Sequence, residues 1–265
     1  MVRKFGMIGG GMMGEALLSR LVAQKVFEAD AIVVSEPSQA RQELLAQQYN
    51  VHVTNENRQA AESEIVLLAV KPQIFPKVAQ ELAGQTRSAL VISILAGTTL
   101  KQLEAAFPGQ PVIRAMPNTP AAVGAGMTAI AGGQHAEKHH LEQATEILGT
   151  VGKVVEVPES MLDAVTGLSG SGPGYIAIVI EALADGGVAA GLPRAIAMEL
   201  AIQTVKGTAQ LLDEEGIHPG VLKDRVTSPG GTTIAGIGEL ERNGVRSAFI
   251  QAVKVATERS RELGQ

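Results

Sequence analysis

A glycine-rich turn near the start of the chain restricts the fold most. It reads Gly9-Gly10-Gly11-Met12-Met13-Gly14 and fits the pattern G-x-G-x-x-G. The turn follows an apolar run at residues 4–8 and precedes a helical pattern at residues 12–24, the context in which this pattern indicates a nucleotide site. The first glycine permits a tight turn, the second lets the backbone reach a pyrophosphate, and the last lets the helix pack on the strand. We therefore predict a dinucleotide-binding turn, with a purely structural glycine turn as the alternative.

Strand and helix patterns alternate in the first part of the chain, and only helical patterns follow. The sequence predicts strands at residues 4–8, 31–34, 65–70, 90–94 and 111–116. Beyond residue 158 it predicts helices alone, at residues 160–167, 173–190, 193–213, 218–226, 232–243 and 245–263. Such alternation favours a parallel, doubly wound sheet. We therefore predict an α/β Rossmann-like dinucleotide-binding domain at residues 1–158, followed by an all-helical domain at residues 159–265.

The composition of the 265 residues argues against several functions. A net charge of -5 disfavours a sequence-independent grip on nucleic acid, which needs a basic surface. No stretch approaches the roughly 20 apolar residues that cross a bilayer. The chain has no cysteine, which leaves neither a disulfide nor a thiolate nucleophile. Its first residues run straight into a predicted strand, without a signal-peptide pattern. We expect a cytoplasmic protein that binds neither nucleic acid nor membrane.

The second predicted strand ends at Ser35 and Glu36, where the adenosine ribose is expected. Glu36 lies 22 residues after Gly14, close to the spacing of the acid that binds the ribose 2′-OH of NAD. A carboxylate there would repel the 2′-phosphate of NADP. Ser35, Ser38 and Arg41, however, could bind such a phosphate, and Glu36 could instead point to solvent. The preference between NADPH and NADH stays open here, and we expect both to be used.

Three further turns, at residues 69–72, 96–97 and 118–120, follow predicted strands and lie at the same edge of the sheet. Open α/β sheets bind ligands outside the carboxyl ends of their strands, so these turns belong to the expected cofactor site. Lys71 could be a charge near the reacting centre or a solvated lysine. Asn118 could hydrogen-bond the nicotinamide or its ribose, or only shape the turn before Pro120. The complete predicted cofactor set is Gly9, Gly10, Gly11, Met12, Met13, Ser35, Glu36, Asn55, Ala69, Val70, Lys71, Pro72, Ala96, Gly97 and Asn118.

Two stretches rich in glycine and hydroxyl groups interrupt the helical half. In the first, Gly167–Tyr175, Ser171 can cap a helix that has Pro173 at an early position. The second reads Ser228-Pro229-Gly230-Gly231-Thr232-Thr233. It places threonine hydroxyls and free N–H groups at a helix start, which suits a small carboxylate. Ordinary helix capping is the other interpretation.

Small residues are dense in the segment Glu181–Gly191, at the end of the helix predicted at residues 173–190. They let helix backbones approach closely. A dimerisation face is one reading, since closed symmetric dimers are the commonest assembly. Packing within one chain is the other, and the helices alone do not decide between them.

Four motifs together resemble those of the pyrroline-5-carboxylate reductase family. They are Ala69–Pro72, Arg114–Pro120, Leu168–Pro173 and Leu222–Thr233. They follow the family's order over nearly the whole chain, and the stretch from Ser228 to Thr233 is the most specific. The resemblance implies NAD(P)H-dependent reduction of 1-pyrroline-5-carboxylate to L-proline. It also implies a helical domain that interleaves with its twin into a homodimer, and further assembly of dimers into a ring.

The same resemblance assigns site residues. It gives the substrate carboxylate to Ser228, Gly230, Gly231, Thr232 and Thr233. Thr233 is the expected catalytic residue, facing the ring nitrogen. Three positions depart from the family: Met12 where Asn is frequent, Glu36 where a small polar residue favours NADPH, and Gly174 where Ala is usual. The second departure again leaves the cofactor preference open.

Two other functions fit parts of the sequence. A two-domain hydroxyacid dehydrogenase would need an ionisable group on a helix, for which Lys206 is the best candidate. A nicotinamide-binding regulatory module would need no catalytic group. The intact loop at residues 228–233 disfavours both. His135, His139 and His140 could gather on one helical face, but a solvated face is favoured over a metal site because no acid or cysteine ligand completes it.

Overall fold

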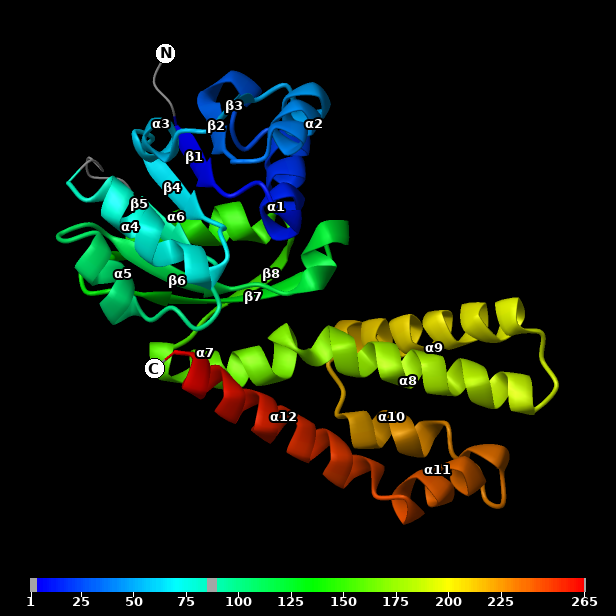
Figure 1. The fold of residues 1–265 in the computed structure, drawn as a ribbon. Helices are drawn as coiled ribbons and strands as arrows, with labels where there is room; N and C mark the ends of the chain where they lie inside the picture. Colours follow the sequence, from blue (N-terminus) through cyan, green and yellow to red (C-terminus); the bar gives the residue numbers. More distant parts are fainter. Residues whose placement is uncertain (1–3, 85–89, 265) are drawn as a thin grey trace. The chain divides into compact units, whose positions relative to one another are not determined.

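The computed structural model describes residues 4–84 and 90–264 (Figure 1). They form two compact units, each described here by itself. The first unit runs to Ser171 and resumes at Val255, and the second comprises Gly172–Lys254. The predicted run from the N-terminus into the first strand begins at residues 1–3, which lie outside the described residues. The first described strand begins at Phe5.

An eight-stranded sheet forms the centre of the first unit, in the order β3-β2-β1-β4-β5-β6-β7-β8. Neighbouring strands are parallel except β6 and β7. The strands are β1 (Phe5–Ile8), β2 (Ile32–Ser35), β3 (His52–Thr54), β4 (Ile65–Leu68), β5 (Leu90–Ser93), β6 (Val112–Met116), β7 (Gly126–Gly132) and β8 (Gly152–Glu156). The predicted doubly wound α/β fold is therefore confirmed. The chain turns back between β1 and β4, and such switch points hold ligands at the carboxyl ends of the strands.

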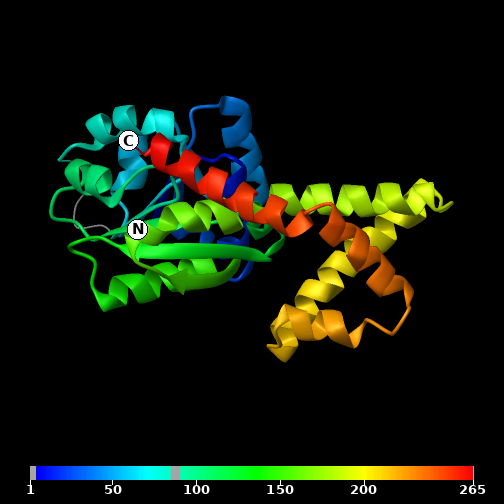
Figure 2. The ribbon, with the colours of Figure 1, turned by 90° about the horizontal axis from the view of Figure 1, so that it is seen from below.

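Helices cover both faces of this sheet (Figures 1 and 2). Successive strand residues point to opposite faces, so Met7 belongs to one hydrophobic core and Ile8 to the other. The first core takes in α1 (Met12–Ala23), α2 (Gln39–Tyr49) and α6 (Lys138–Gly149). The second takes in α3 (Asn57–Ala61), α4 (Phe75–Leu82) and α5 (Leu100–Ala106). Strands buried on both faces read as apolar runs, as β4 does with Ile-Val-Leu-Leu.

The sequence predicts five of these strands and misses β3, β7 and β8. Strand β3 has only three residues. Strand β7 begins and ends with glycine, which weakens a strand pattern. Strand β8 reads Gly-Lys-Val-Val-Glu and has no fully buried residue, so it lacks the apolar run that marks a buried strand. These strands owe their place to pairing with neighbours rather than to a local signal.

The compact units do not divide at the boundary predicted after residue 158. After η4 (Glu159–Met161), the short helix α7 (Leu162–Val165) buries Leu162 in the second core of the sheet unit. A π-helical turn, η5 (Thr166–Gly170), follows. The last helix also contributes: the Ser260 hydroxyl donates to the Asp163 carboxylate at 2.6 Å. The sheet unit extends past the prediction because these later segments complete its packing.

The second unit is helical, as the sequence predicts for this part of the chain. It contains α8 (Gly172–Ala189), α9 (Arg194–Glu215), α10 (Pro219–Arg225), α11 (Thr232–Arg242) and the first part of α12 (Val245–Leu263). Its buried core is small and consists of Ala184, Ala197 and Ala201. Many large apolar side chains remain exposed: Ile176, Ile178, Leu183, Leu192, Ile196, Leu200, Ile202, Leu211, Val221, Val226, Ile234, Leu240, Phe249 and Ile250. Within residues 4–84 and 90–264, no helix is long and apolar enough to span a membrane.

Candidate functional site

The glycine turn joins β1 to α1 in a form that only glycine supports. Gly9 has a φ of 106°, in the left-handed region, and its N–H donates to the Ser35 carbonyl at 2.8 Å. A Cβ on Gly9 would lie 2.6 Å from the Ala69 carbonyl oxygen, and one on Gly14 would lie 2.4 Å from that of Gly9. A Cβ on Gly11, the N-cap of α1, would meet nothing within 4 Å. The turn therefore packs tightly on the backbone of Ala69, directly after β4, and leaves open space beside Gly11.

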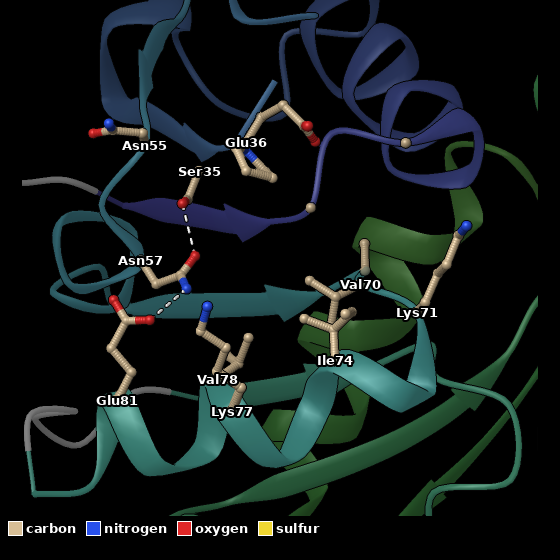
Figure 3. A pocket seen from close by; sticks show the side chains of 14 residues that line it. Ser35, Glu36, Asn55, Asn57, Val70, Lys71, Ile74, Lys77, Val78 and Glu81 are labelled. Carbon is tan, nitrogen blue, oxygen red and sulfur yellow. Dashed lines mark hydrogen bonds between the residues drawn. The ribbon is translucent and has the colours of Figure 1, made fainter. Parts of the chain in front are cut away.

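A cleft of about 480 Å³ lies beside this turn, at the switch point of the sheet (Figure 3). It is lined by Gly9, Gly11, Ser35, Glu36, Pro37, Asn55, Asn57, Ala69, Val70, Lys71, Ile74, Lys77, Val78 and Glu81. Of the predicted cofactor residues, the structure brings together Gly9, Gly11, Ser35, Glu36, Asn55, Ala69, Val70 and Lys71 in this lining. The open space at Gly11 and the free helix start beside it fit the diphosphate of a dinucleotide.

Glu36 is turned toward the glycine turn and not simply toward solvent. One carboxylate oxygen accepts from the Gly10 N–H at 2.9 Å, and the other accepts from the Ser38 N–H at 3.0 Å. Its own N–H donates to the Thr54 carbonyl at 2.9 Å. The charge of Glu36 therefore remains at the cleft, while both of its oxygens already have a backbone donor.

Arg41 does not line the cleft, although the sequence offers it as a phosphate ligand. Its Nε donates to the Gly10 carbonyl at 2.9 Å, and a terminal nitrogen pairs with Glu15. The Tyr49 hydroxyl donates to the other oxygen of Glu15 at 2.9 Å. Burial raises the pKa of Glu15, but the hydrogen bonds from Arg41 and Tyr49 outweigh it and leave that pKa lowered. Burial and the hydrogen bond to Glu15 raise the pKa of Tyr49 to about 12.

A hydrogen-bonded row of side chains lines another part of the cleft (Figure 3). The Ser35 hydroxyl donates to Asn57 Oδ1 at 2.7 Å, and Asn57 Nδ2 donates to Glu81 at 2.9 Å. Two exposed lysines, Lys71 and Lys77, also line the cleft, and neither forms an ion pair with the residues that the structure describes. Their ammonium groups can pair with the phosphates of a bound ligand.

Sequence reasoning misses six lining residues. Pro37, Asn57, Ile74, Lys77, Val78 and Glu81 are the additional ones. Asn57 begins α3, with two residues between it and β3, a strand too short to give a pattern. Lys77 and Glu81 are four residues apart on α4, so they share one helix face. A helical projection of α4 could have indicated the pair, but not that this face borders the cleft.

The remaining predicted cofactor residues lie outside this lining. Met12 is 90% exposed at the start of α1, and Met13 packs partly against the first core. Gly10 faces α2, where a Cβ would come 2.6 Å from Leu45 Cδ1. Pro72 starts the short helix η2 (Pro72–Ile74). These four neighbour the cleft along the chain without lining it.

Ala96, Gly97 and Asn118 follow later strands and also lie outside the lining. Ala96 is exposed. A Cβ on Gly97 would meet the Leu263 carbonyl oxygen at 3.3 Å, so this glycine admits the end of α12. Asn118 donates to the Ser169 carbonyl at 3.0 Å and accepts from the Met127 N–H at 2.8 Å. Its side chain therefore braces the first unit.

The predicted substrate loop leads into α11 in the second unit. Gly230 has a φ of 67°, and the Gly231 N–H donates to the Ser228 carbonyl at 3.0 Å. Gly231 is the N-cap of α11 and supplies no side-chain cap. Within residues 4–84 and 90–264, the hydroxyls of Ser228, Thr232 and Thr233 have no hydrogen-bond partner, so ordinary capping does not explain these side chains.

The lysine considered for a hydroxyacid dehydrogenase and the histidines considered for a metal site lie outside the cleft. Lys206 is exposed on α9. His139 and His140 lie side by side at the start of α6, with tilted rings whose centres are 3.7 Å apart, and His140 accepts from the Glu137 N–H at 3.0 Å. The described residues contain no group of three or more side chains that could hold a metal ion.

The glycine turn, the switch-point cleft and the helical second unit together define a dinucleotide-dependent oxidoreductase. Two family models match the chain: "NADP oxidoreductase coenzyme F420-dependent" over residues 4–97 and "Pyrroline-5-carboxylate reductase dimerisation" over residues 159–263. The second match begins at the boundary predicted from the sequence.

Several known proteins that resemble the chain over its full length are pyrroline-5-carboxylate reductases. The pyrroline-5-carboxylate reductase of Synechocystis sp. is 57% identical over 263 residues, which cover 99% of this chain and 98% of that one. A solved structure of the Coxiella burnetii enzyme has a TM-score of 0.93 at 34% identity, covering both chains fully. The Plasmodium falciparum enzyme, solved with NADP bound, has a TM-score of 0.89 at 29% identity and full coverage. The chain belongs to the pyrroline-5-carboxylate reductase family.

Proposed function

We propose that this protein reduces 1-pyrroline-5-carboxylate to L-proline with NADPH, the last step of proline biosynthesis. The observation that carries this proposal is the 57% identity to a pyrroline-5-carboxylate reductase over 99% of the chain. The cleft beside Gly11 supports the cofactor, and the unpaired hydroxyls at the start of α11 support the imino acid.

The main catalytic contribution of the protein is to position the nicotinamide and the imino acid for hydride transfer. When bound, the reduced nicotinamide supplies the hydride that the C=N carbon accepts, and the ring nitrogen, protonated beforehand, becomes the amine. The first N–H groups of α11 point out of the helix start and carry its partial positive charge, so they hold the substrate carboxylate. The Thr233 hydroxyl hydrogen-bonds the ring nitrogen. Holding two reactants in the correct geometry can lower the barrier by about 7–11 kcal/mol, so no strong acid is required.

NADPH and NADH both serve in this proposal, with a smaller bias toward NADPH than the family usually has. The carboxylate of Glu36 at the cleft opposes a 2′-phosphate, whereas Lys71 and Lys77 favour one. Because charges of both signs line the same cleft, the two cofactors compete on similar terms.

The working form in this proposal is a homodimer built from the second unit. Its small buried core and its exposed isoleucines and leucines leave a large apolar surface, which marks an interface. The dimers assemble further into a ring, and the mass of the particle in solution tests this. We place the enzyme in the cytoplasm, which cell fractionation tests.

The reaction is tested by following NADPH oxidation with 1-pyrroline-5-carboxylate beside a panel of 2-keto and 3-hydroxy acids. Rapid oxidation with the imino acid alone is the expected result. Faster turnover of a hydroxy or keto acid would assign the protein to the rival dehydrogenase class, and cofactor binding without any turnover would indicate a regulatory module.

A further inference from the structure

Gly10 is held from both sides by charged side chains. Its N–H donates to Glu36 Oε2 at 2.9 Å, and its carbonyl accepts from Arg41 Nε at 2.9 Å. The two partners come from the segment between β2 and the first turn of α2, 26 and 31 residues further along the chain. Gly10 has no side chain to fix its own conformation, so these two contacts fix the peptide planes on either side of it.

The orientation of one of these planes matters for a ligand. The Gly10 carbonyl and the Gly11 N–H belong to the same peptide group, and in a trans peptide they point in opposite directions. Arg41 holds the carbonyl on the side of α2, which turns the Gly11 N–H away from α2. Gly11 lines the cleft and has open space beside it. Arg41 thus sets the direction of a donor at the point where a diphosphate is expected.

Arg41 is itself fixed by a second contact. Its terminal nitrogen pairs with Glu15 in the first turn of α1, and Tyr49 donates to the same carboxylate at 2.9 Å. A free carboxylate in the first turn of α1 would repel a diphosphate at the helix start. The guanidinium donates in two fixed directions at once, which the point charge of a lysine cannot do.

We propose that Arg41 is a positioning residue for the diphosphate of the cofactor: it orients the Gly10–Gly11 peptide and neutralises Glu15, and it does not bind the 2′-phosphate. This rests on the proposed use of NADPH and NADH. Both cofactors contain the diphosphate and only NADPH contains the 2′-phosphate, so their relative loss separates the two roles.

The test is calorimetric binding of NADPH and of NADH, without imino acid, to the full chain and to Arg41→Gln. The expected result is a loss of about tenfold in affinity for both cofactors, equivalent to about 1.4 kcal/mol, with their ratio unchanged. Arg41→Lys is expected to weaken both at least about threefold, because the charge remains while the fork is lost. Loss confined to NADPH, unchanged binding of both cofactors, or full recovery with lysine would overturn the proposal.

A matched control removes the same charge elsewhere. Lys101 is exposed on α5, and Lys101→Gln is expected to bind both cofactors as the parent does. At saturating NADPH, Arg41→Gln should retain both the turnover number and the Michaelis constant for the imino acid, whereas a general folding defect would lower the apparent turnover number. If Arg41→Gln does not fold, Tyr49→Phe weakens the same network, and an equal loss of about two- to threefold for both cofactors is expected. Unchanged binding in a folded Tyr49→Phe would contradict the proposal. Failure of the parent to reduce the imino acid while binding NADPH would sink the proposed function alone.

Discussion

The side chain of Asn118 joins two motifs by donating to the backbone carbonyl of Ser169 at 3.0 Å. Its oxygen accepts from the Met127 N–H at 2.8 Å, so both ends of the amide are engaged within the sheet unit. Asn118→Ala would leave a backbone donor without its partner, at a cost of about 1–3 kcal/mol. We expect a clearly lower melting temperature and less than a threefold change in NADPH affinity. Unchanged stability with a large loss of NADPH affinity would instead make Asn118 a cofactor ligand.

Replacing Glu36 with Ser should shift the cofactor preference toward NADPH. The substitution removes a negative charge from the cleft, and two unit charges about 5 Å apart interact by a few kcal/mol at an effective dielectric of about 20. We expect the Michaelis constant for NADPH to fall relative to that for NADH by about tenfold, with the maximal rate at saturating NADPH nearly unchanged. Because Glu36 also holds Gly10, both constants can rise together, and only their ratio is diagnostic. An unmoved ratio would place Glu36 away from the ribose.

The Thr233 hydroxyl should act on chemistry more than on binding. Losing one well-placed hydrogen-bond partner in the transition state costs up to about 3 kcal/mol, and less charge develops here, so we expect roughly a 10- to 150-fold fall in turnover number for Thr233→Ala. Its Michaelis constant for the imino acid should change little, whereas Ser228→Ala and Thr232→Ala should mainly raise that constant. Steady-state kinetics of the three folded variants measures this. Near-normal turnover by Thr233→Ala would leave the hydroxyl without a catalytic role.

The hydroxyl of Tyr49 should titrate at about pH 12, because burial and its hydrogen bond to Glu15 raise its pKa from 10. A raised pKa means that the interaction stabilises the fold fully below pH 10 and loses this contribution as the pH rises toward 12. Ultraviolet absorbance of the phenolate in Tyr175→Phe, which leaves Tyr49 as the one tyrosine, measures the value. Adding Glu15→Gln should lower it. A Tyr49 that titrates at 10 while the protein is folded would contradict the network.

The exposed apolar faces of the second unit should be covered by a second copy of the chain. Ile178 is 66% exposed on α8, and a charge there would be buried on association. Sedimentation at low micromolar concentration should show no monomer for the parent and dissociation for Ile178→Glu. Leu44→Glu makes the same kind of change on α2 of the sheet unit, where Leu44 is 41% exposed, and should remain associated. A folded, active monomer of the parent would refute the dimer.

Much of the fold follows from local pattern. The glycine turn predicts the first strand, the first helix and the edge of the sheet where a nucleotide binds. This pattern is informative because a side chain at Gly9 or Gly14 would collide with neighbouring backbone atoms. The missed strands β3, β7 and β8 are short, bounded by glycine or partly exposed, so their formation depends on sheet partners that a local reading does not contain.

The site divides in the same way. Spacing places Glu36 at the end of β2, but its two backbone donors depend on how the segment after β2 folds back over the glycine turn. The sequence suggests Arg41 as a phosphate ligand because its position near Glu36 is all that a local pattern shows. Its actual bonds, to Gly10 in the glycine turn and to Glu15 on α1, depend on how α2 packs against these segments. Asn57 and Lys77 escape notice because they line the cleft from helices whose orientation is set by packing.

The fate of the transferred hydride tests the proposed reaction most directly. The protein is supplied with 1-pyrroline-5-carboxylate and NADPH that carries deuterium at its transferable position, and the product is examined by mass spectrometry and NMR. We predict L-proline with one deuterium on the ring carbon that was part of the C=N bond, formed one for one with the NADPH consumed. Proline without deuterium, or NADPH consumption without proline, would contradict the account.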